Sequence, residues 1–379
     1  MTESRRSDAS PPVGVLERDN WVSPSPAPSS PSPYVHDRGT ELYSPLSGAT
    51  LPKGGEAHLA LTRMAAGEDP DAHAAVLEHL RAARFLIEDV ESETRRSRLL
   101  YVSLETCTSC NHRCPFCPVS VAPREMEVMS QELFASIVEQ VAAMGEEGVV
   151  VFLSNYNEPT VDPLFEERCR LLFEKGLPVT ILTNASHFTP DRAERLEALG
   201  RFRYIGVNLP TLDPERYFQL HGTKDLARVL ANVDAMHARS LADETAIVVL
   251  GDEDDAHRRD VEEITARFGP KGWTVKPFKI RSRPSSGTYV PQPPPKKKLR
   301  GCELMGSRPF EHLHVTATAK AVLCCQDYYE HLTVGDLKTQ TVAQLLGGDT
   351  MARLRKWTYG VEEAPADFLC RSCEFALGE

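Results

Sequence analysis

Nine of the ten cysteines in this 379-residue chain fall into two groups, one within residues 107–117 and one within residues 302–373. The long stretch between the groups holds a single cysteine, Cys169. The N-terminus has Arg5 and Arg6 but no apolar segment after them, so we expect neither a secretory signal nor a disulfide framework. Clustered free thiols in such a chain indicate that it binds a metal or an iron–sulfur cluster.

The first group contains Cys110, Cys114 and Cys117 in the pattern C-x3-C-x2-C, within the segment "CNHRCPFC". Three thiolates can hold three irons of a four-iron cluster, which leaves the fourth iron open to a cofactor or substrate. The alternative is a structural zinc site, which needs a fourth ligand, and Cys107 or His112 could supply it. We favour the cluster because the pattern directly follows a predicted strand of a parallel barrel, where reactive groups gather.

The second group offers five cysteines for a four-cysteine site: Cys302, Cys324, Cys325, Cys370 and Cys373. The last two form a C-x2-C pair, "CRSC", which is a metal-ligand spacing. Spacing alone leaves zinc and an iron–sulfur cluster as equal alternatives for this group. Cys107 and Cys325 are either buried or hydrogen-atom donors, and Cys169 is predicted to lie in the core.

Residues 99–282 alternate strand and helix patterns, and this alternation must position the first cysteine group. The six predicted strands are "LLYVSLE", "GVVVFLSNYNEP", "PVTILTN", "RYIGVNL", "TAIVVLG" and "TVKPFKIRS". Five helical segments separate them, and the first has Leu133, Ile137, Val141 and Met144 on one face. The alternation implies right-handed βαβ units and a curved parallel sheet, an α/β fold whose chemistry takes place at the carboxyl ends of the strands.

Four further segments surround this core of residues 94–282. Residues 1–33 are rich in Ser and Pro and are predicted to be a disordered tail. Residues 34–93 show strand, helix, helix and strand patterns, the order of a small winged-helix-like module, although a packing extension of the core fits them equally well. Residues 283–300 form a predicted Pro-rich linker. Residues 301–379, with a predicted hairpin and helix, hold the second cysteine group.

The overall composition argues against several partners. The formal net charge is −11, so we do not expect a nucleic-acid partner bound by a broad basic surface. No apolar run approaches the roughly 20 residues that cross a bilayer, so we expect a cytoplasmic protein without a membrane partner. Hydrophobic residues make up 41% and charged residues 26%, as in an ordinary globular protein.

The pattern of Cys110, Cys114 and Cys117, with Phe116 before the last cysteine, resembles the motif of the radical SAM superfamily. The resemblance places Phe116 in the cofactor site. Three later segments resemble family motifs in the same order: "NYNEP" resembles G-G-E-P, "LTNA" resembles T-N-G, and "VNLP" resembles the site of a polar residue on the ribose. The resemblance spans residues 99–282 and implies a partial (β/α)6 barrel.

The resemblance implies roles for three residues that follow strands. Glu158 would accept a hydrogen bond from the amino group of SAM, Asn184 would point into the barrel, and Asn208 would contact the ribose. Tyr156 and Asn157 replace the two usual glycines, so the backbone contacts of that loop differ from the family pattern. All three polar residues are therefore expected to bind the cofactor.

The resemblance also implies the chemistry. The open iron chelates the amino and carboxylate groups of SAM. One electron from the reduced [4Fe–4S] cluster, supplied by a reductant such as flavodoxin or ferredoxin, cleaves the S–C5′ bond. The resulting 5′-deoxyadenosyl radical abstracts a hydrogen atom from the substrate. The cofactors carry this chemistry, whereas the protein positions the substrate and excludes water, so no catalytic side chain is assigned.

The second cysteine group resembles the twitch extension, a shorter relative of the SPASM domain. This resemblance implies an auxiliary [4Fe–4S] cluster. Its implied ligands are Cys302, Cys324, Cys370 and Cys373. The family spacing favours Cys324 over its neighbour Cys325. A glycine usually stands five positions before the hairpin ligand, and here that position is Ala319. Four cysteine ligands leave no open iron, so the implied role of this cluster is electron transfer.

Two classes of substrate remain open. Residues 34–93 resemble small winged-helix elements that bind the leaders of precursor peptides, which predicts modification of a ribosomally synthesised peptide. Enzymes with a twitch extension also include sugar and aminocyclitol dehydrogenases and epimerases, which tend to lack an N-terminal module. A non-enzymatic binding or zinc protein is disfavoured because both cysteine sets are complete.

Overall fold

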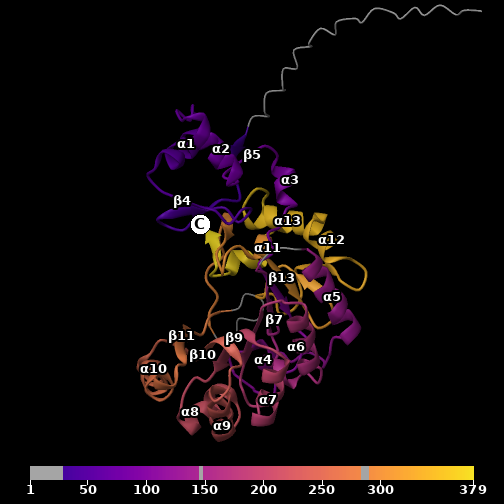
Figure 1. Cartoon of the computed structure of the whole chain (residues 1–379). Helices are drawn as coiled ribbons and strands as arrows, with labels where there is room; N and C mark the ends of the chain where they lie inside the picture. Colours follow the sequence, from indigo (N-terminus) through magenta and orange to yellow (C-terminus); the bar gives the residue numbers. More distant parts are fainter. Residues whose placement is uncertain (1–28, 145–147, 283–289) are drawn as a thin grey trace, which may run out of the picture.

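The computed structural model describes residues 29–144, 148–282 and 290–379 (Figure 1). Most of the predicted disordered tail, residues 1–28, lies outside the described residues, and so does the first part of the predicted linker, residues 283–289. Within the described parts of the chain, no helix is long and apolar enough to cross a membrane.

A nine-stranded sheet forms the centre of the molecule. Seven of its strands are parallel, and six of these correspond to the six predicted ones: β6 (Tyr101–Leu104), β7 (Val150–Phe152), β8 (Val179–Thr183), β9 (Phe202–Asn208), β10 (Ala242–Gly251) and β11 (Thr274–Lys279). The other three are β13 (His312–Val315), β14 (Lys320–Val322) and β15 (Thr333–Asp336). The strand order is β11-β10-β9-β8-β7-β6-β13-β14-β15. The predicted α/β class with a parallel sheet is confirmed.

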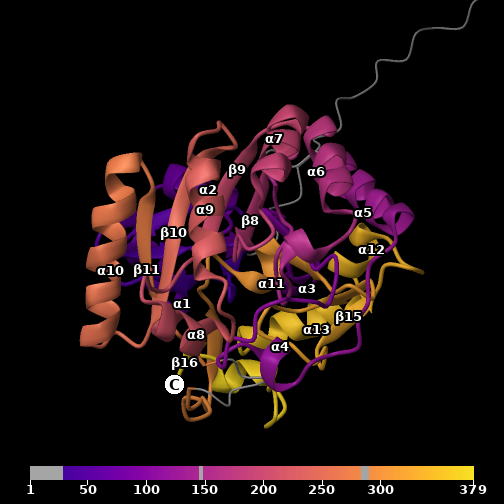
Figure 2. The ribbon, with the colours of Figure 1, turned by 90° about the horizontal axis from the view of Figure 1, so that it is seen from below.

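Helices cover one face of this sheet (Figure 2): α5 (Gln131–Ala143), α6 (Phe165–Glu174), α7 (Pro190–Leu199), α9 (Leu226–His237) and α10 (Asp255–Phe268). Strand residues on that face, such as Ile181, Ile205 and Ile247, are fully buried in the main core. Alternate residues point to the opposite, inner face, where Leu182 stays 47% and Phe278 51% exposed. The sheet therefore keeps an open interior.

Two short helices lie outside the predicted pattern: α4 (Pro118–Val121), directly after the last motif cysteine, and α8 (Pro214–His221). The side chain of Asp213 caps α8 by accepting a hydrogen bond from the backbone N–H of Arg216 at 2.7 Å. The helix ends at Gly222, whose φ of +67° suits glycine. This C-terminal end of α8 contacts the first cysteine loop.

The C-terminal unit continues the central sheet, because β13 pairs in parallel with β6. Its remaining elements are β12 (Leu299–Cys302), α11 (Arg308–Glu311), α12 (Val342–Leu346), α13 (Asp349–Thr358), the 3-10 helix η3 (Leu369–Ser372) and β16 (Ala376–Gly378). The predicted hairpin is β13–β14. The single helix predicted over residues 342–357 is two helices, because Gly347 and Gly348 separate α12 from α13.

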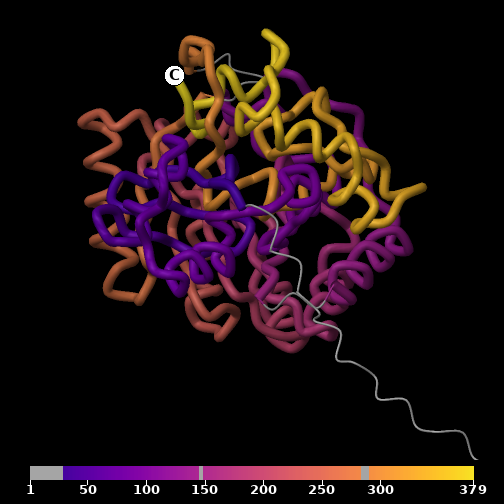
Figure 3. The backbone as a smooth tube through the Cα atoms, turned by 90° about the horizontal axis from the view of Figure 1, so that it is seen from above, coloured from indigo at the N-terminus to yellow at the C-terminus, as the bar shows by residue number. Residues whose placement is uncertain are grey.

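The N-terminal residues fold into a small module, which packs on the C-terminal unit (Figures 1 and 3). Its elements are β1 (Ser30–Pro31), β2 (His36–Asp37), β3 (Glu41–Tyr43), β4 (Thr50–Pro52), α1 (Glu56–Ala65), α2 (Ala74–Ala82), β5 (Leu86–Ile87) and α3 (Val90–Thr94). Strands β2, β3 and β4 form one antiparallel sheet, and β1 pairs with β5. Strand β1 corrects the predicted end of the tail at residue 33. The backbone N–H of Ser32 donates to Phe85 O at 2.9 Å, which holds this stretch in place.

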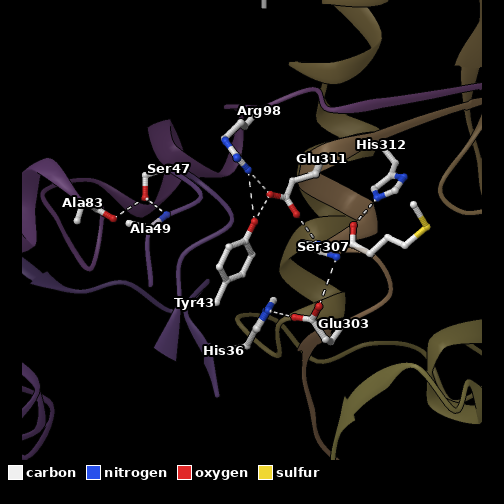
Figure 4. Close-up of polar contacts among 12 residues, drawn as sticks. His36, Tyr43, Ser47, Ala49, Ala83, Arg98, Glu303, Ser307, Glu311 and His312 are labelled. Atoms are coloured by element: carbon white, nitrogen blue, oxygen red, sulfur yellow. Dashed lines mark hydrogen bonds and ion pairs between the residues drawn. The ribbon is translucent and has the colours of Figure 1, made fainter. Parts of the chain in front are cut away.

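A buried carboxylate fastens the module to the C-terminal unit (Figure 4). Glu311 accepts hydrogen bonds from the hydroxyl of Tyr43 and from the guanidinium of Arg98. It also accepts the backbone N–H of Ser307 at 2.6 Å. Burial raises the pKa of Glu311, and these three donors oppose that effect. Removing one of these donors would leave the buried carboxylate incompletely hydrogen-bonded, which would lower the free energy of unfolding.

Two more contacts lie beside this carboxylate. Glu303 accepts a hydrogen bond from His36 Nε2 at 2.7 Å. The rings of Tyr34, Phe310 and Tyr359 pack edge to face, with centroids 4.9 to 5.5 Å apart. Aromatic pairs of this kind contribute roughly 0.5–1.5 kcal/mol each beyond the area that they bury. The module is therefore packed firmly on the segment that joins β12 to β13.

Tyr43→Phe should weaken this contact by about 1.5–3 kcal/mol, because it removes a hydrogen bond to a buried carboxylate. Thermal unfolding of the cluster-loaded protein should show a lower Tm. Tyr329→Phe is the matched control, since the Tyr329 ring is exposed, and it should leave the Tm unchanged. Equal Tm values for the two variants would show that the bond between Tyr43 and Glu311 contributes no stability.

Candidate active site

The first cysteine motif lies in the loop that leaves the carboxyl end of β6. Cys110, Cys114 and Cys117 are all half-buried there. The backbone N–H of Arg113 donates to His221 O, at the end of α8, at 2.9 Å. The N–H of Cys117 donates to Cys114 O at 3.0 Å and closes a tight turn. The three thiols are therefore held together at the rim of the barrel.

The three cysteines of this loop could be held as thiolates only beside a cationic group. Burial, with smaller contributions from Glu158 and Cys117, raises the pKa of the Cys110 thiol to about 12. Burial also raises the pKa of Cys114, and the other two thiols add to this effect. Three neighbouring thiolates are stable only when a metal centre neutralises their charge. A cluster with three cysteine ligands meets this requirement.

Zinc is the alternative for this loop. Cys114 Sγ and ring nitrogens of His112 and His221 lie within 4.8 Å of one another, which makes three potential zinc ligands. That group would leave two of the three motif cysteines unused. Cys107 does not join it and is fully buried. We therefore propose that the three motif cysteines hold an iron–sulfur cluster.

Glu158, in the loop after β7, is 3% exposed and has one oxygen with spare capacity. Its Oε1 accepts the N–H and hydroxyl of Thr160, at 3.1 and 2.6 Å, and the hydroxyl of Thr183 at 2.6 Å. Its Oε2 accepts the N–H of Asn184 at 2.7 Å. A carboxylate oxygen can accept two hydrogen bonds, so Oε2 can take one more donor. The predicted bond from the SAM ammonium group fits this oxygen.

The two predicted asparagines have different surroundings. Asn184 Nδ2 donates to Asn111 Oδ1 at 3.0 Å and lies 3.9 Å from Cys110 Sγ, so it connects the end of β8 to the cysteine loop. Asn208 Oδ1, at the end of β9, is buried without a hydrogen-bond partner among the described residues. A ribose hydroxyl would satisfy that acceptor. The predicted cofactor residue Phe116 is half-buried within the motif loop.

The two residues that replace glycine in the loop after β7 both make contacts. Tyr156 is buried, its hydroxyl donates to Cys325 O, and its ring packs edge to face on Tyr328 with centroids 4.8 Å apart. Asn157 Oδ1 accepts the backbone N–H of Asn155 at 2.9 Å. Tyr156 therefore joins the loop of Glu158 to the C-terminal unit.

One small cavity in the C-terminal unit is lined by four cysteines: Cys302, Cys324, Cys370 and Cys373. All four are buried. Burial raises the pKa of the Cys302 thiol to about 12 and also raises that of Cys373. Four thiolates in this space again require a cationic centre, and the site fits an iron–sulfur cluster. Cys325 is half-buried and does not line the cavity. We propose the four lining cysteines as the ligands.

Several residues that build the site carried weak or no sequence signals. Thr160 and Thr183 both bind Glu158. Thr160 directly follows "NYNEP" and Thr183 is the threonine of "LTNA", so their positions could have identified them. His221 carried no signal, because its role depends on the unpredicted helix α8. Cys169 is fully buried in the main core, as predicted.

Comparison with known proteins gives two family matches. The model of the radical SAM superfamily matches residues 104–264, and that of the SPASM iron–sulfur cluster-binding domain matches residues 302–374. Among curated proteins, GTP 3′,8-cyclase of Pseudomonas putida (strain W619) is 30% identical over 139 residues, which are 36% of this chain and 40% of that protein. The chain thus spans less than half the length of such relatives.

Two solved structures share the fold. SuiB of Streptococcus suis, bound to its precursor peptide SuiA, aligns with a TM-score of 0.57 and 13% identity over 92% of this chain and 93% of that chain. The enzyme anSMEcpe, with bound AdoMet, aligns with a TM-score of 0.55 and 13% identity over 73% of this chain and 83% of that chain. The two family matches confirm the predicted resemblance to the radical SAM superfamily and to a SPASM-like C-terminal domain, and the two structures share the fold.

Glu158→Gln should weaken SAM binding about 10- to 100-fold, because a charge-assisted hydrogen bond of about 1.5–3 kcal/mol is lost. Equilibrium binding of SAM to the anaerobically prepared protein would measure this, and the iron content should stay normal. Glu167→Gln removes an equal charge from the surface of α6 and should bind SAM normally. Wild-type affinity in the Glu158 variant would mean that this carboxylate does not contact SAM.

Cys324→Ser should lower the iron content by about one four-iron cluster, because it removes a ligand from a closed four-cysteine site. Cys325→Ser, the adjacent control, should retain full iron, since its side chain does not line the cavity. Iron and sulfide analysis after anaerobic reconstitution distinguishes the variants. Full iron in Cys324→Ser together with loss of one cluster in Cys325→Ser would show that Cys325, and not Cys324, is the cluster ligand.

Proposed function

This chain belongs to the radical SAM superfamily, and from that premise we propose that it modifies a peptide substrate, part of which binds next to the N-terminal module. The enzyme uses SAM and [4Fe–4S] clusters, one in the radical SAM domain and a further one in the SPASM domain. The observation that carries the peptide proposal is a groove between the module and the C-terminal unit.

This groove has a volume of about 850 Å³. The module lines it with Val35, Leu42 and Leu61, among others, and the C-terminal unit contributes Leu299 and Tyr359. A second hollow of about 360 Å³ shares Leu299 as a lining residue, so the two hollows adjoin. Together the two hollows have a larger volume than the roughly 300–1,000 Å³ that sites for small molecules typically enclose.

The rim of the groove is basic, although the chain as a whole has a net charge of −11. Lys53, Lys298 and Arg300 line it, with one acidic residue, Asp37. Lys53 is paired with Asp37 and Arg300 with Glu379, whereas Lys298 makes no ion pair among the described residues. Strand β2 borders the groove, and one of its edges is unpaired among the described strands. An extended segment with apolar and acidic side chains would complement these walls and could add to that edge.

A separate docking groove serves a peptide better than a small molecule. Ordering each residue of a flexible chain costs roughly 1–2 kcal/mol of backbone entropy, and the barrel contacts few of those residues. Docking elsewhere raises the effective concentration of the reacting segment to the order of millimolar. A sugar or aminocyclitol can be enclosed by the barrel itself and needs no such groove.

The likeness to SuiB supports the same proposal. That structure holds a precursor peptide, and its alignment covers 92% of this chain, which is too much to omit the N-terminal module. The alignment with anSMEcpe covers 73% of this chain. We therefore extend to this chain the peptide class of substrate, without its sequence.

Inside the barrel, side chains hold the cofactor and shield the reaction. When SAM is bound, Glu158 Oε2 would accept a hydrogen bond from its ammonium group, and Asn208 Oδ1 would accept one from a ribose hydroxyl. Tyr101, Phe152 and Leu182, on the inner face, provide walls that keep water from the substrate. SAM on its cluster supplies the 5′-deoxyadenosyl radical after one-electron reduction, for which the proposal includes a small carrier such as flavodoxin or ferredoxin.

Ala65→Trp should raise the KM for the peptide at least tenfold, because the indole fills the groove from the exposed surface of α1. Formation of 5′-deoxyadenosine without peptide should stay unchanged. Leu59→Trp is the matched control: Leu59 lies on the same helix, is 55% exposed and does not line the groove. The assay would use a short peptide encoded beside the gene, with turnover followed by mass spectrometry. An unchanged KM in the Ala65 variant would exclude the groove as the docking site.

A further inference from the structure

Arg308, the first residue of α11, lies against the cysteine-lined cavity. It lines that cavity together with all four proposed ligands. Its backbone N–H donates a hydrogen bond to the thiol of Cys302. The residue is 9% exposed, so its guanidinium group is largely removed from water.

The hydrogen-bond partners of this guanidinium are neutral. Arg308 Nη1 lies 2.9 Å from His312 Nδ1 and 3.4 Å from His314 Nε2. His312 Nε2 is 2.9 Å from Met305 O (Figure 4) and must carry the proton in that bond, so Nδ1 is a bare acceptor. Burial also lowers the pKa of both imidazoles, which keeps them uncharged. Neither imidazole ring therefore adds a positive charge or balances the positive charge of Arg308.

No carboxylate among the described residues lies within ion-pair distance of Arg308, and its Nε has no hydrogen-bond partner there. By contrast Arg168, which is also buried, has Asp162 at 3.2 Å. An unbalanced buried charge costs several kcal/mol, so an anion is expected beside this guanidinium. The cysteine cavity is the place for it. Four thiolates around a [4Fe–4S]2+ core give a net charge of about −2.

We propose that Arg308 is the counter-charge of the auxiliary cluster and makes that cluster easier to reduce. Reduction adds one negative charge to the cluster. A fixed cation at the wall of a buried cavity stabilises that charge, because little water is present to screen it. Net charge, nearby hydrogen bonds and solvent exposure are the factors that set such potentials. The inference rests on the auxiliary cluster and holds for any substrate class.

The position of Arg308 also relates its charge to the reaction inside the barrel. His312 stacks on Tyr101, at the inner face of β6, with ring centroids 4.6 Å apart. Arg308 is therefore linked through His312 to the inner face of the sheet. A cluster that is easier to reduce is a better acceptor for one electron from a substrate radical. The radical gives this electron to the cluster, whose core goes from 2+ to 1+, and releases a proton to solvent to become a closed-shell product.

The test is a redox titration of the holoenzyme with SAM, in which electron paramagnetic resonance follows the cluster signal that SAM does not alter. Arg308→Gln should shift the reduction equilibrium at least tenfold toward the oxidised cluster, which is a fall of about 59 mV for one electron. Arg308→Lys keeps the charge and should stay within about threefold of wild type, about 30 mV by the same constant.

Lys320→Gln is the matched control, because it removes an equal charge from β14, in the hairpin that follows α11. The side chain of Lys320 is 46% exposed and paired with Glu330 at 3.1 Å, so the potential should not move. Loss of the auxiliary cluster in the Gln variant but not in the Lys variant would also support a counter-charge. A wild-type potential in Arg308→Gln would overturn the proposal. Loss of the cluster in both Arg308 variants would overturn it too, since shape and not charge would then be the requirement.

Discussion

The parallel pairing of β13 with β6 is the contact on which the rest of the site depends. β6 leads into the loop of the first cysteine motif, and β13 begins the hairpin that leads to Cys324. One set of backbone hydrogen bonds therefore fixes both cluster sites relative to each other. Its register places His314 opposite Ser103. A slip by one residue would turn His312 and His314 to the helix-covered face and remove the acceptors of Arg308.

The segment from the end of β12 to the start of β13 both binds the N-terminal module and lines the cysteine cavity. Glu303 and Glu311 bind the N-terminal module, whereas Cys302 and Arg308 face the cysteine cavity. The backbone N–H of Ser307 donates to the same carboxylate that accepts from Tyr43. A shift of the module thus acts on the wall of the auxiliary site through covalent neighbours. Interiors are close-packed, so such a shift is transmitted and not absorbed.

What could be predicted from the sequence was local. The parallel strands, their covering helices and the three motif cysteines depend on periodicity and short spacing. Spacing did not determine which of Cys324 and Cys325 lines the cavity, because the two residues are adjacent in the sequence and only the folded chain shows which of them contributes to the wall. The sequence likewise showed that Ala319 departs from glycine, but only the structure shows its φ of +70°, a conformation in which an L-residue is strained.

The remaining features join segments far apart in the chain, and no local pattern encodes them. The spare acceptor of Glu158 becomes evident only when Thr183 and Asn184, from the next strand, occupy the others. The pairing of β13 with β6 and the lack of a carboxylate beside Arg308 are likewise properties of the folded chain. A sequence can show that a charged residue is present. Whether an opposite charge lies beside it depends on every element packed around it.

Tyr156 shows how a departure from a motif can be compensated. A glycine at this position would leave the loop of Glu158 without a side chain and free to approach the cofactor. Here the ring of Tyr156 packs on Tyr328, and its hydroxyl binds the carbonyl of Cys325, which follows a proposed ligand of the auxiliary cluster. The hydroxyl of Tyr328 in turn donates to Ala122 O, just after α4, at 2.7 Å. The loop of Glu158 is thereby fixed to the segment that carries Cys324 and Cys325, and its geometry is set by the C-terminal unit as well as by its own backbone.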